Sequence, residues 1–100
     1  IDRAVADFER AYFNVQYHAG TKQVIPIETG WPTHDGFVGD AIASIENATR
    51  YFQELMAWAR KHGVVIYWFE AFNELFKRQL EAPYAASWGM RHHETLARKY

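Results

Sequence analysis

Two glutamates stand directly after apolar stretches of this chain, where their carboxylates could take part in acid–base or covalent chemistry. Glu28 follows Val24-Ile25-Pro26-Ile27 and leads into the turn-forming residues Thr29-Gly30-Trp31-Pro32. Glu70 follows the apolar run from Val64 to Phe69. An acid at the carboxyl end of a buried strand is in the position from which a barrel enzyme presents a catalytic side chain. The pattern therefore predicts that both acids belong to one active face.

Aromatic residues accompany these acids. Trp31 lies in the turn after Glu28, while Trp68 and Phe72 flank Glu70. Flat rings pack on the apolar faces of pyranoses, and polar groups take the hydroxyls, so the combination points to a carbohydrate. Retaining cleavage of a glycosidic bond needs two carboxyl groups roughly 5–5.5 Å apart, one as nucleophile and one as acid/base. Helix capping or ion pairing is the alternative role for a single acid in such a place.

Two amphipathic helices are predicted to hold these segments. The first runs from an N-cap at Asp2 to Gly20, and the second from an N-cap at Asp40 to Gly63. Asp is a favoured N-cap residue, and Gly commonly ends a helix. A loop rich in Gly, Pro, Thr and Asp is predicted for residues 29–39. Each predicted strand is a short continuous apolar run, as expected for strands buried on both faces of a parallel sheet.

The C-terminal third is predicted to be less regular. A short helix is expected from Asn73 or Glu74 to about Leu80, and a last helix near His93 to Lys99. The order is helix, strand, helix, strand, short helix, which predicts an α/β fold built from βα units.

Two strands are too few for a stable parallel sheet, because each leaves unpaired backbone groups on its outer edge. Residues 1–100 are therefore interpreted as one partial (β/α)₈ TIM barrel without a second domain, since a whole barrel usually takes ~250 residues. The rest of the barrel is expected in the parent protein. The alternative is a small α/β protein that dimerises to complete its sheet.

Composition narrows the possible partners. The formal net charge is −1 and there are no cysteines, so no nucleic-acid partner, no anionic membrane surface and no thiolate metal site is predicted. The longest apolar run, Val64 to Phe69, is too short to cross a bilayer. The chain begins at Ile1 rather than Met, and we expect it to be a segment of a longer protein.

Other chemically suggestive groups carry less weight. His92-His93-Glu94 has no third ligand at helical spacing, so no metal site is predicted. Ser44 and Ser87 are outside any Gly-x-Ser-x-Gly setting, which argues against a serine nucleophile. His34-Asp35, just after Glu28, is interpreted as a solvated loop. No cofactor is predicted.

The string Glu28-Thr29-Gly30-Trp31-Pro32, together with Tyr67 to Glu74 and Lys77, resembles glycoside hydrolase family 17. That family comprises β-1,3-glucanases and related β-glucan glucanosyltransferases, and Ser87-Trp88-Gly89 also fits it. The resemblance implies a chain that covers strands seven and eight of the barrel. It implies a β-glucan oligo- or polysaccharide as substrate, β-1,3-linked by expectation, and a secreted or cell-envelope setting.

By this resemblance Glu28 is the nucleophile. The substrate-binding residues implied in the same way are Trp31, Glu70, Phe72, Glu74 and Lys77. Glu74 and Lys77 are expected near the nucleophile, where the ammonium favours its charged form. The family's acid/base glutamate is expected upstream of this chain, and Asn73-Glu74 follows the wrong strand to supply it. The isolated chain is therefore expected to be inactive.

Pro26 departs from the pattern, because it removes a donor from the middle of a strand and predicts a bulge or a shifted register there. Two alternatives remain open. One is a non-catalytic carbohydrate-binding or scaffold remnant, which would use Trp31, Trp68 and Phe72 as stacking surfaces. The other is the small α/β dimer, with no sugar chemistry.

Overall fold

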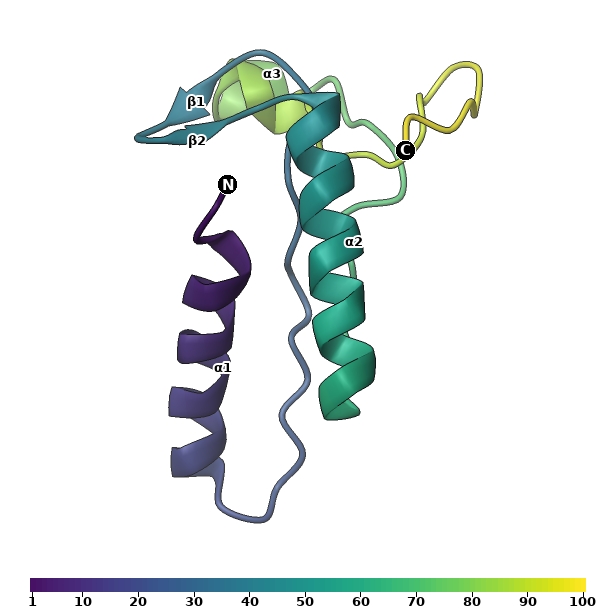
Figure 1. Cartoon of the computed structure of the whole chain (residues 1–100). Coiled ribbons are helices and arrows are strands. Elements are labelled where there is room, and N and C mark those ends of the chain that lie inside the picture. The colour runs from purple at the N-terminus through teal and green to yellow at the C-terminus, as the bar shows by residue number, and fades with distance from the viewer.

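The computed structural model describes residues 1–100 and contains two long helices, a short hairpin and a loop-rich C-terminal third. Figure 1 shows the long helices side by side, with the shorter elements gathered at one end of them. The elements are, in chain order, α1 (Ala4–Ala19), β1 (Phe37–Val38), β2 (Ala41–Ile42), α2 (Ile45–His62), α3 (Lys77–Leu80) and the 3₁₀ helix η1 (Pro83–Ser87). None of these helices has the length and apolar character that crossing a bilayer requires.

Helix α1 confirms the first predicted helix, although its start differs. It ends at Gly20, whose φ of 63° lies in the left-handed region that glycine enters readily. The prediction of Asp2 as the N-cap is wrong, because the cap residue is Arg3 and makes no side-chain hydrogen bond to the helix. The Asp2 carboxylate instead accepts a hydrogen bond from Arg50 Nη1 of α2 at 2.7 Å. A contact between helices thus replaces the local cap.

Helix α2 confirms the second predicted helix, again with a different start. Its N-cap is Ser44, whose hydroxyl accepts a hydrogen bond from the Asn47 backbone N–H at 3.0 Å. The prediction of Asp40 as the cap is wrong, because Gly39-Asp40 forms the two-residue turn of the hairpin between β1 and β2. At the other end, Gly63 is left-handed, with φ of 64°, and closes the helix as predicted.

The core lies between the helices and one side of the extended chain. Leu55 is fully buried at its centre, with Tyr51 and Trp58 one turn away on either side. The ring of Trp58 meets the ring edges of Phe8 and Tyr12 from α1, each at 5.2 Å between centroids. Burial of these large rings contributes to the apolar stabilisation that joins α1 to α2. The buried core residues are Trp31, Ala48, Tyr51, Leu55, Trp58 and Ala59.

The two predicted strands are present as extended segments rather than as regular strands. They run parallel through one bridge between Thr29 and Trp68. Tyr67 N–H donates to the Pro26 carbonyl at 2.9 Å, and Phe69 N–H donates to the Thr29 carbonyl at 2.8 Å. Pro26 has no N–H to return to the ladder. The pairing therefore stays short, and the regular sheet is the antiparallel hairpin β1–β2. Strand β1 lies in the region predicted as loop, whereas β2 replaces what was predicted as the first turn of the second helix.

One face of these extended segments is covered and the other is open. Ile66 and Trp68 pack against the core cluster, whereas Val65 and Tyr67 are 50% and 61% exposed. Ile27 on the neighbouring segment is also exposed. The prediction of strands buried on both faces is wrong for this chain, because α2 and α1 cover one face and no other element lies on the opposite face. Buried and exposed side chains therefore alternate along the segment, as in a sheet that is covered on one side.

The C-terminal third differs most from the predictions. The short helix is confined to α3 and begins at Lys77 rather than at Asn73 or Glu74. The last predicted helix, His93 to Lys99, is wrong: Arg91 pairs with Arg98 in an antiparallel bridge. The tail folds back on itself, because the Lys99 N–H also donates to the Met90 carbonyl at 2.9 Å, and this pairing replaces the local helical pattern.

Candidate active site

The loops after the two extended segments meet because the segments pair in parallel. The bridge joins Thr29, which follows Glu28, to Trp68, which lies two residues before Glu70, so both acids lie close to the carboxyl end of the pair. Gly30 permits this close approach, because a Cβ at that position would collide with the backbone carbonyl of Phe69. The glycine of the Glu-Thr-Gly string is therefore required by the backbone that faces it.

Glu28 is exposed at the edge of an open depression of about 320 Å³. The other lining residues are Thr29, Gly30, Phe69 and Trp88. The rings of Phe69 and Trp88 meet edge to face at 5.7 Å between centroids. A free carboxylate beside two aromatic rings can contact both the hydroxyls and the apolar face of a sugar, and the volume is within the range of roughly 300–1,000 Å³ for ligand sites.

A buried tyrosine holds the backbone next to Glu28. The hydroxyl of Tyr51, on α2, lies 2.9 Å from Thr29 Oγ1 and shares a hydrogen bond with it. Burial raises the pKa of Tyr51, and the hydrogen bond to Thr29 opposes that change. The helix thereby fixes the residue that follows Glu28.

Three predicted site residues form one charged cluster. Lys77 Nζ donates to the two carboxylate oxygens of Glu70 at 3.0 and 3.3 Å and also pairs with Glu74. The side chains of Lys77 and Glu70 are only 13% and 14% exposed. Lys77 Nζ also lies 4.5 Å from the centroid of the Phe69 ring that lines the depression. The lysine is thus committed to Glu70 and Glu74, and it reaches the Glu28 depression through the Phe69 ring rather than through an ion pair with Glu28.

The protonation of this cluster follows from burial and pairing. Burial raises the pKa of Glu70, although hydrogen bonding to Lys77 opposes the change and the neighbouring Glu74 reinforces it. The hydrogen bond to Lys77 lowers the pKa of Glu74. Burial alone would lower the pKa of Lys77, but its hydrogen bonds to Glu74 and Glu70 outweigh burial and raise it. The ammonium therefore stays charged, and Glu70 is the acid of the cluster that takes up a proton most readily.

The rings of Trp31 and Trp68 pack mainly in the core, although Trp31 also borders an apolar cavity. Trp31 is 9% exposed, packs on Tyr51, and donates from Nε1 to the Ile42 carbonyl of the hairpin at 2.8 Å. Trp68 packs between Phe52 and Tyr51. Two of the three rings suggested as stacking surfaces are therefore part of the core, which argues against the binding-remnant alternative in that form.

Phe72 is exposed but lies outside the Glu28 depression. It lines a separate shallow hollow with Ala71, Met90, Arg91 and Arg98. The structure thus brings Glu70, Glu74 and Lys77 together, and it leaves Phe72 apart from them.

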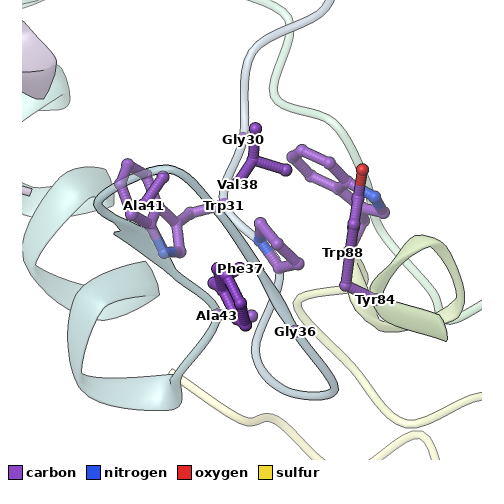
Figure 2. Close-up of a pocket in the computed structure, with 10 residues that line it drawn as sticks. Gly30, Trp31, Gly36, Phe37, Val38, Ala41, Ala43, Tyr84 and Trp88 are labelled. Carbon is purple, nitrogen blue, oxygen red and sulfur yellow. The ribbon is translucent and has the colours of Figure 1, made fainter. Parts of the chain in front are cut away.

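A second cavity, of about 300 Å³, adjoins the first (Figure 2). It is mostly apolar and lies between the β1–β2 hairpin and the side chains of Tyr84 and Trp88. Figure 2 shows Trp31 and Trp88 on opposite sides of this space. Trp88 lines both cavities and so forms their common wall.

Sequence analysis missed Phe69 and Trp88 as site residues. Phe69 directly precedes Glu70, and a search for rings next to the candidate acids would have found it. Trp88 is part of the Ser-Trp-Gly string, but nothing local shows that this string folds back to Glu28. The His92-His93-Glu94 string lies in an exposed turn, and the chain contains no cluster of three metal-ligating side chains.

Several fungal proteins are similar to this chain in sequence. A glucan 1,3-β-glucosidase of Schizosaccharomyces pombe is 39% identical over an alignment of 75 residues, and the alignment covers 73% of this chain and 23% of that protein. A glucan 1,3-β-glucosidase of Candida albicans is 40% identical over 50 residues, or 50% of this chain and 16% of that protein. No protein-family model matches the chain.

Solved structures of Rhizomucor miehei proteins share the fold. An active-site mutant of a β-1,3-glucanosyltransferase in complex with laminaritriose superposes with a TM-score of 0.85 at 22% identity, over 99% of this chain and 38% of that one. A glycoside hydrolase family 17 β-1,3-glucanosyltransferase superposes with a TM-score of 0.84 at 25% identity, over 91% of this chain and 33% of that one. The chain thus spans well under half the length of each of these proteins.

Proposed function

This chain belongs to glycoside hydrolase family 17, and we propose that it is part of a retaining enzyme that hydrolyses or transfers β-linked glucosyl units, most directly those of β-1,3-glucans. Glu28 is the nucleophile in this proposal. The observation that carries it is the free carboxylate of Glu28 in a depression walled by Phe69 and Trp88. The similar proteins named as 1,3-β-glucosidases and as a β-1,3-glucanosyltransferase support the substrate class.

We further propose that residues 1–100 form the C-terminal part of a (β/α)₈ barrel and include its last two strands. The parallel pairing of the extended segments supports this arrangement. The open apolar face that carries Ile27, Val65 and Tyr67 supports it too, because an inward-facing barrel surface needs the other strands to cover it. The small dimer that completes its own sheet is the competing explanation for the same open face.

In the proposed reaction the Glu28 carboxylate attacks the anomeric carbon while the glycosidic bond breaks. The departing oxygen takes a proton from a general acid, which the part of the enzyme outside this chain supplies. Water or a sugar hydroxyl then attacks the glycosyl–Glu28 ester and gives its proton to the same group, so the configuration is retained. Phe69 and Trp88 pack on the apolar face of the sugar, and Glu70 and Glu74 accept hydrogen bonds from hydroxyls.

The test uses the parent enzyme and laminarin, a β-1,3-glucan. Glu28→Gln keeps the shape of the side chain but cannot form the ester, and we expect turnover to fall by about a thousandfold or more. Glu46→Gln, an exposed acid in the first turn of α2, is the matched control and keeps full turnover.

A second variant separates a nucleophile from an acid that only binds substrate. The Glu28→Gly variant is given azide and dinitrophenyl β-laminaribioside as substrate. Azide occupies the space of the missing carboxylate and attacks the anomeric carbon as dinitrophenolate leaves. An α-glycosyl azide is the expected product. Full turnover in Glu28→Gln, or no α-azide from Glu28→Gly in a folded enzyme, would contradict the assignment.

The purified 100-residue chain distinguishes the alternatives. We expect it to bind laminarioligosaccharides without hydrolysing them. Robust hydrolysis by the chain alone would overturn the proposal that the acid/base lies elsewhere. Glucan binding that survives Glu28→Gln, with no turnover in the parent protein, would favour a binding remnant, and a stable dimer without glucan affinity would favour the small α/β protein.

A further inference from the structure

Lys99, near the end of the chain, differs from the other charged residues in the groups that surround its ammonium. Its ammonium is partly buried and has no carboxylate within ion-pair distance. Nζ donates instead to three neutral oxygens: Asn73 Oδ1 at 2.6 Å, Thr33 Oγ1 at 2.9 Å and the Ser87 carbonyl at 3.3 Å. Burying an ammonium is costly unless hydrogen bonds compensate, so these three acceptors define a specific site for it.

The three acceptors come from three different loops. Thr33 follows the turn after Glu28, Asn73 follows the second extended segment, and Ser87 ends η1. The backbone N–H of Lys99 also donates to the Met90 carbonyl at 2.9 Å. One residue of the tail therefore joins the loops on which both candidate acids and Trp88 are carried.

These bonds converge on the turn that carries Trp88. On one side of Trp88, the Ser87 carbonyl accepts from Lys99 and also from the backbone N–H and hydroxyl of Thr33, both at 3.0 Å. On the other side, Gly89 N–H donates to Asn73 Oδ1 at 3.1 Å, the same oxygen that accepts from Lys99. A Cβ on Gly89 would collide with the Phe72–Asn73 backbone, so this turn is packed tightly against Asn73. Both neighbours of Trp88 are thus bonded to groups that the Lys99 ammonium also contacts.

We propose that Lys99 is a positioning residue that fixes the Ser87–Gly89 turn, and through it the Trp88 ring, against the Glu28 depression. The proposal rests on the proposed function of that depression as a glucan site, because Trp88 is the wall that a sugar would contact. Lys99 touches no substrate in this arrangement and acts through Trp88.

The charge of Lys99 can be changed without mutation. Burial lowers the pKa of Lys99 to about 8, and the nearby negative charge of Glu70 opposes this effect. The pKa of Lys77, the other lysine close to Glu70, is raised instead. Between pH 7 and 9.5 the Lys99 ammonium therefore loses its proton while the Lys77 ammonium keeps its own.

The test follows the four tryptophans by ¹⁹F NMR in the chain labelled with 5-fluorotryptophan, with each signal assigned by a Trp→Phe variant. Lys99→Met keeps the aliphatic stem and removes the ammonium. We expect the Trp88 signal to move or broaden and the signal of Trp58, between the helices, to stay in place. Lys22→Met, at an exposed site after α1, is the matched control and leaves all four signals unchanged.

Two further measurements make the positioning role specific. Raising the pH through about 8 moves the Trp88 signal in the parent chain and not in Lys99→Met. Titration with laminaritriose, followed on the same signal, gives a roughly tenfold weaker affinity in Lys99→Met, since a misplaced ring loses its contact with the sugar.

An unchanged Trp88 signal in Lys99→Met, with the Trp58 signal showing a folded chain, would overturn the proposal. If Lys99→Met does not fold, the pH step in the unmodified chain decides in its place. If laminaritriose does not change the Trp88 signal of the unmodified 100-residue chain, that result would count against the glucan site itself. The Trp88 response without sugar decides the positioning role separately.

Discussion

The helix pair α1–α2 and the loops around Glu28 are stabilised by different kinds of contact. In the helix pair, Leu55 is fully buried in the core and Trp58 packs against rings from α1, and the bonds that form each helix are local in sequence. Around Glu28, the contacts that matter join residues far apart: Lys99 Nζ to Thr33 Oγ1, and the Thr33 N–H to the Ser87 carbonyl.

This difference separates stability from site geometry. Apolar burial tolerates small movements, because it is roughly proportional to area and has no direction. Hydrogen bonds and close backbone approaches do not tolerate them, because they depend on distance and angle. A change in the helix pair should therefore destabilise the chain without a specific effect on the site, whereas a change in the loops should also displace the site residues.

The largest effect is expected in the helix pair. Leu55→Ala removes a fully buried side chain, and we expect the free energy of unfolding to fall by about 2–5 kcal/mol. Urea denaturation followed by far-UV circular dichroism measures it. Gln53→Ala, exposed in the same helix, is the control and should stay within about 0.5 kcal/mol of the parent chain. Similar losses in both variants would show that the packing described for Leu55 is wrong.

The next effect is expected at Gly30. Gly30→Ala places a Cβ against the Phe69 carbonyl, and we expect a loss of about 1–3 kcal/mol of stability from overpacking. We also expect the Trp88 ¹⁹F signal to move, because Gly30 and Trp88 line the same depression.

The control for Gly30 is Gly63→Ala, where a Cβ meets open space and only the positive φ is unfavourable. It should cost about 1 kcal/mol and leave the Trp88 signal where it is. A moved Trp88 signal in the Gly63 variant would break the proposed separation between the two regions.

A smaller effect distinguishes the two candidate caps of α2. Ser44→Ala removes the hydroxyl that accepts from Asn47 N–H, and the expected cost is about 1 kcal/mol. Asp40→Ala, in the hairpin turn, should change the stability by less than about 0.5 kcal/mol. Thermal unfolding followed by circular dichroism measures both changes. A larger fall of the midpoint in Asp40→Ala than in Ser44→Ala would support Asp40 as the N-cap, as the sequence predicts.

The smallest effect is a change of stability with pH. The pKa of Lys99 in the folded chain, about 8, lies below its ordinary value of 10.5. Between these values the unfolded chain binds the proton more strongly, so stability should rise as the pH increases from 8 towards 10. Above about pH 10 the trend should reverse, because burial raises the pKa of Tyr51 and Tyr100 in the folded state.

Urea titrations at pH 8, 9 and 10 measure this change against Lys99→Met, which should lack the rise. If the stability of Lys99→Met rises with pH in the same way, the rise comes from another group and the lowered pKa of Lys99 is contradicted.

Predictions from sequence succeeded where the cause is local. The span and C-terminal end of α1 follow from apolar spacing and Gly20, and Gly63 closes α2 because glycine enters the left-handed region readily. The Glu-Thr-Gly string also located the carboxyl end of the first extended segment. The two-residue Gly39-Asp40 turn carried a hairpin signal, but Asp40 was assigned to capping instead.

Predictions failed where distant contacts decide. The last helix does not form, because the tail pairs with itself and Lys99 is drawn to Thr33 and Asn73. Lys77 pairs with Glu70 as well as with Glu74, and nothing in their spacing favours one carboxylate over the other.

The sequence by itself determined the two helices, the positions of the candidate acids at the ends of extended segments, and the likeness to a glucan-active family. Periodicity, glycine and chemical type act over a few residues, so they can be read along the chain. Only the tertiary structure decided that Trp88 faces Glu28, that Trp31 is buried, and that Lys99 joins three loops. These outcomes depend on which backbones approach each other, and that is set by the packing of the whole chain.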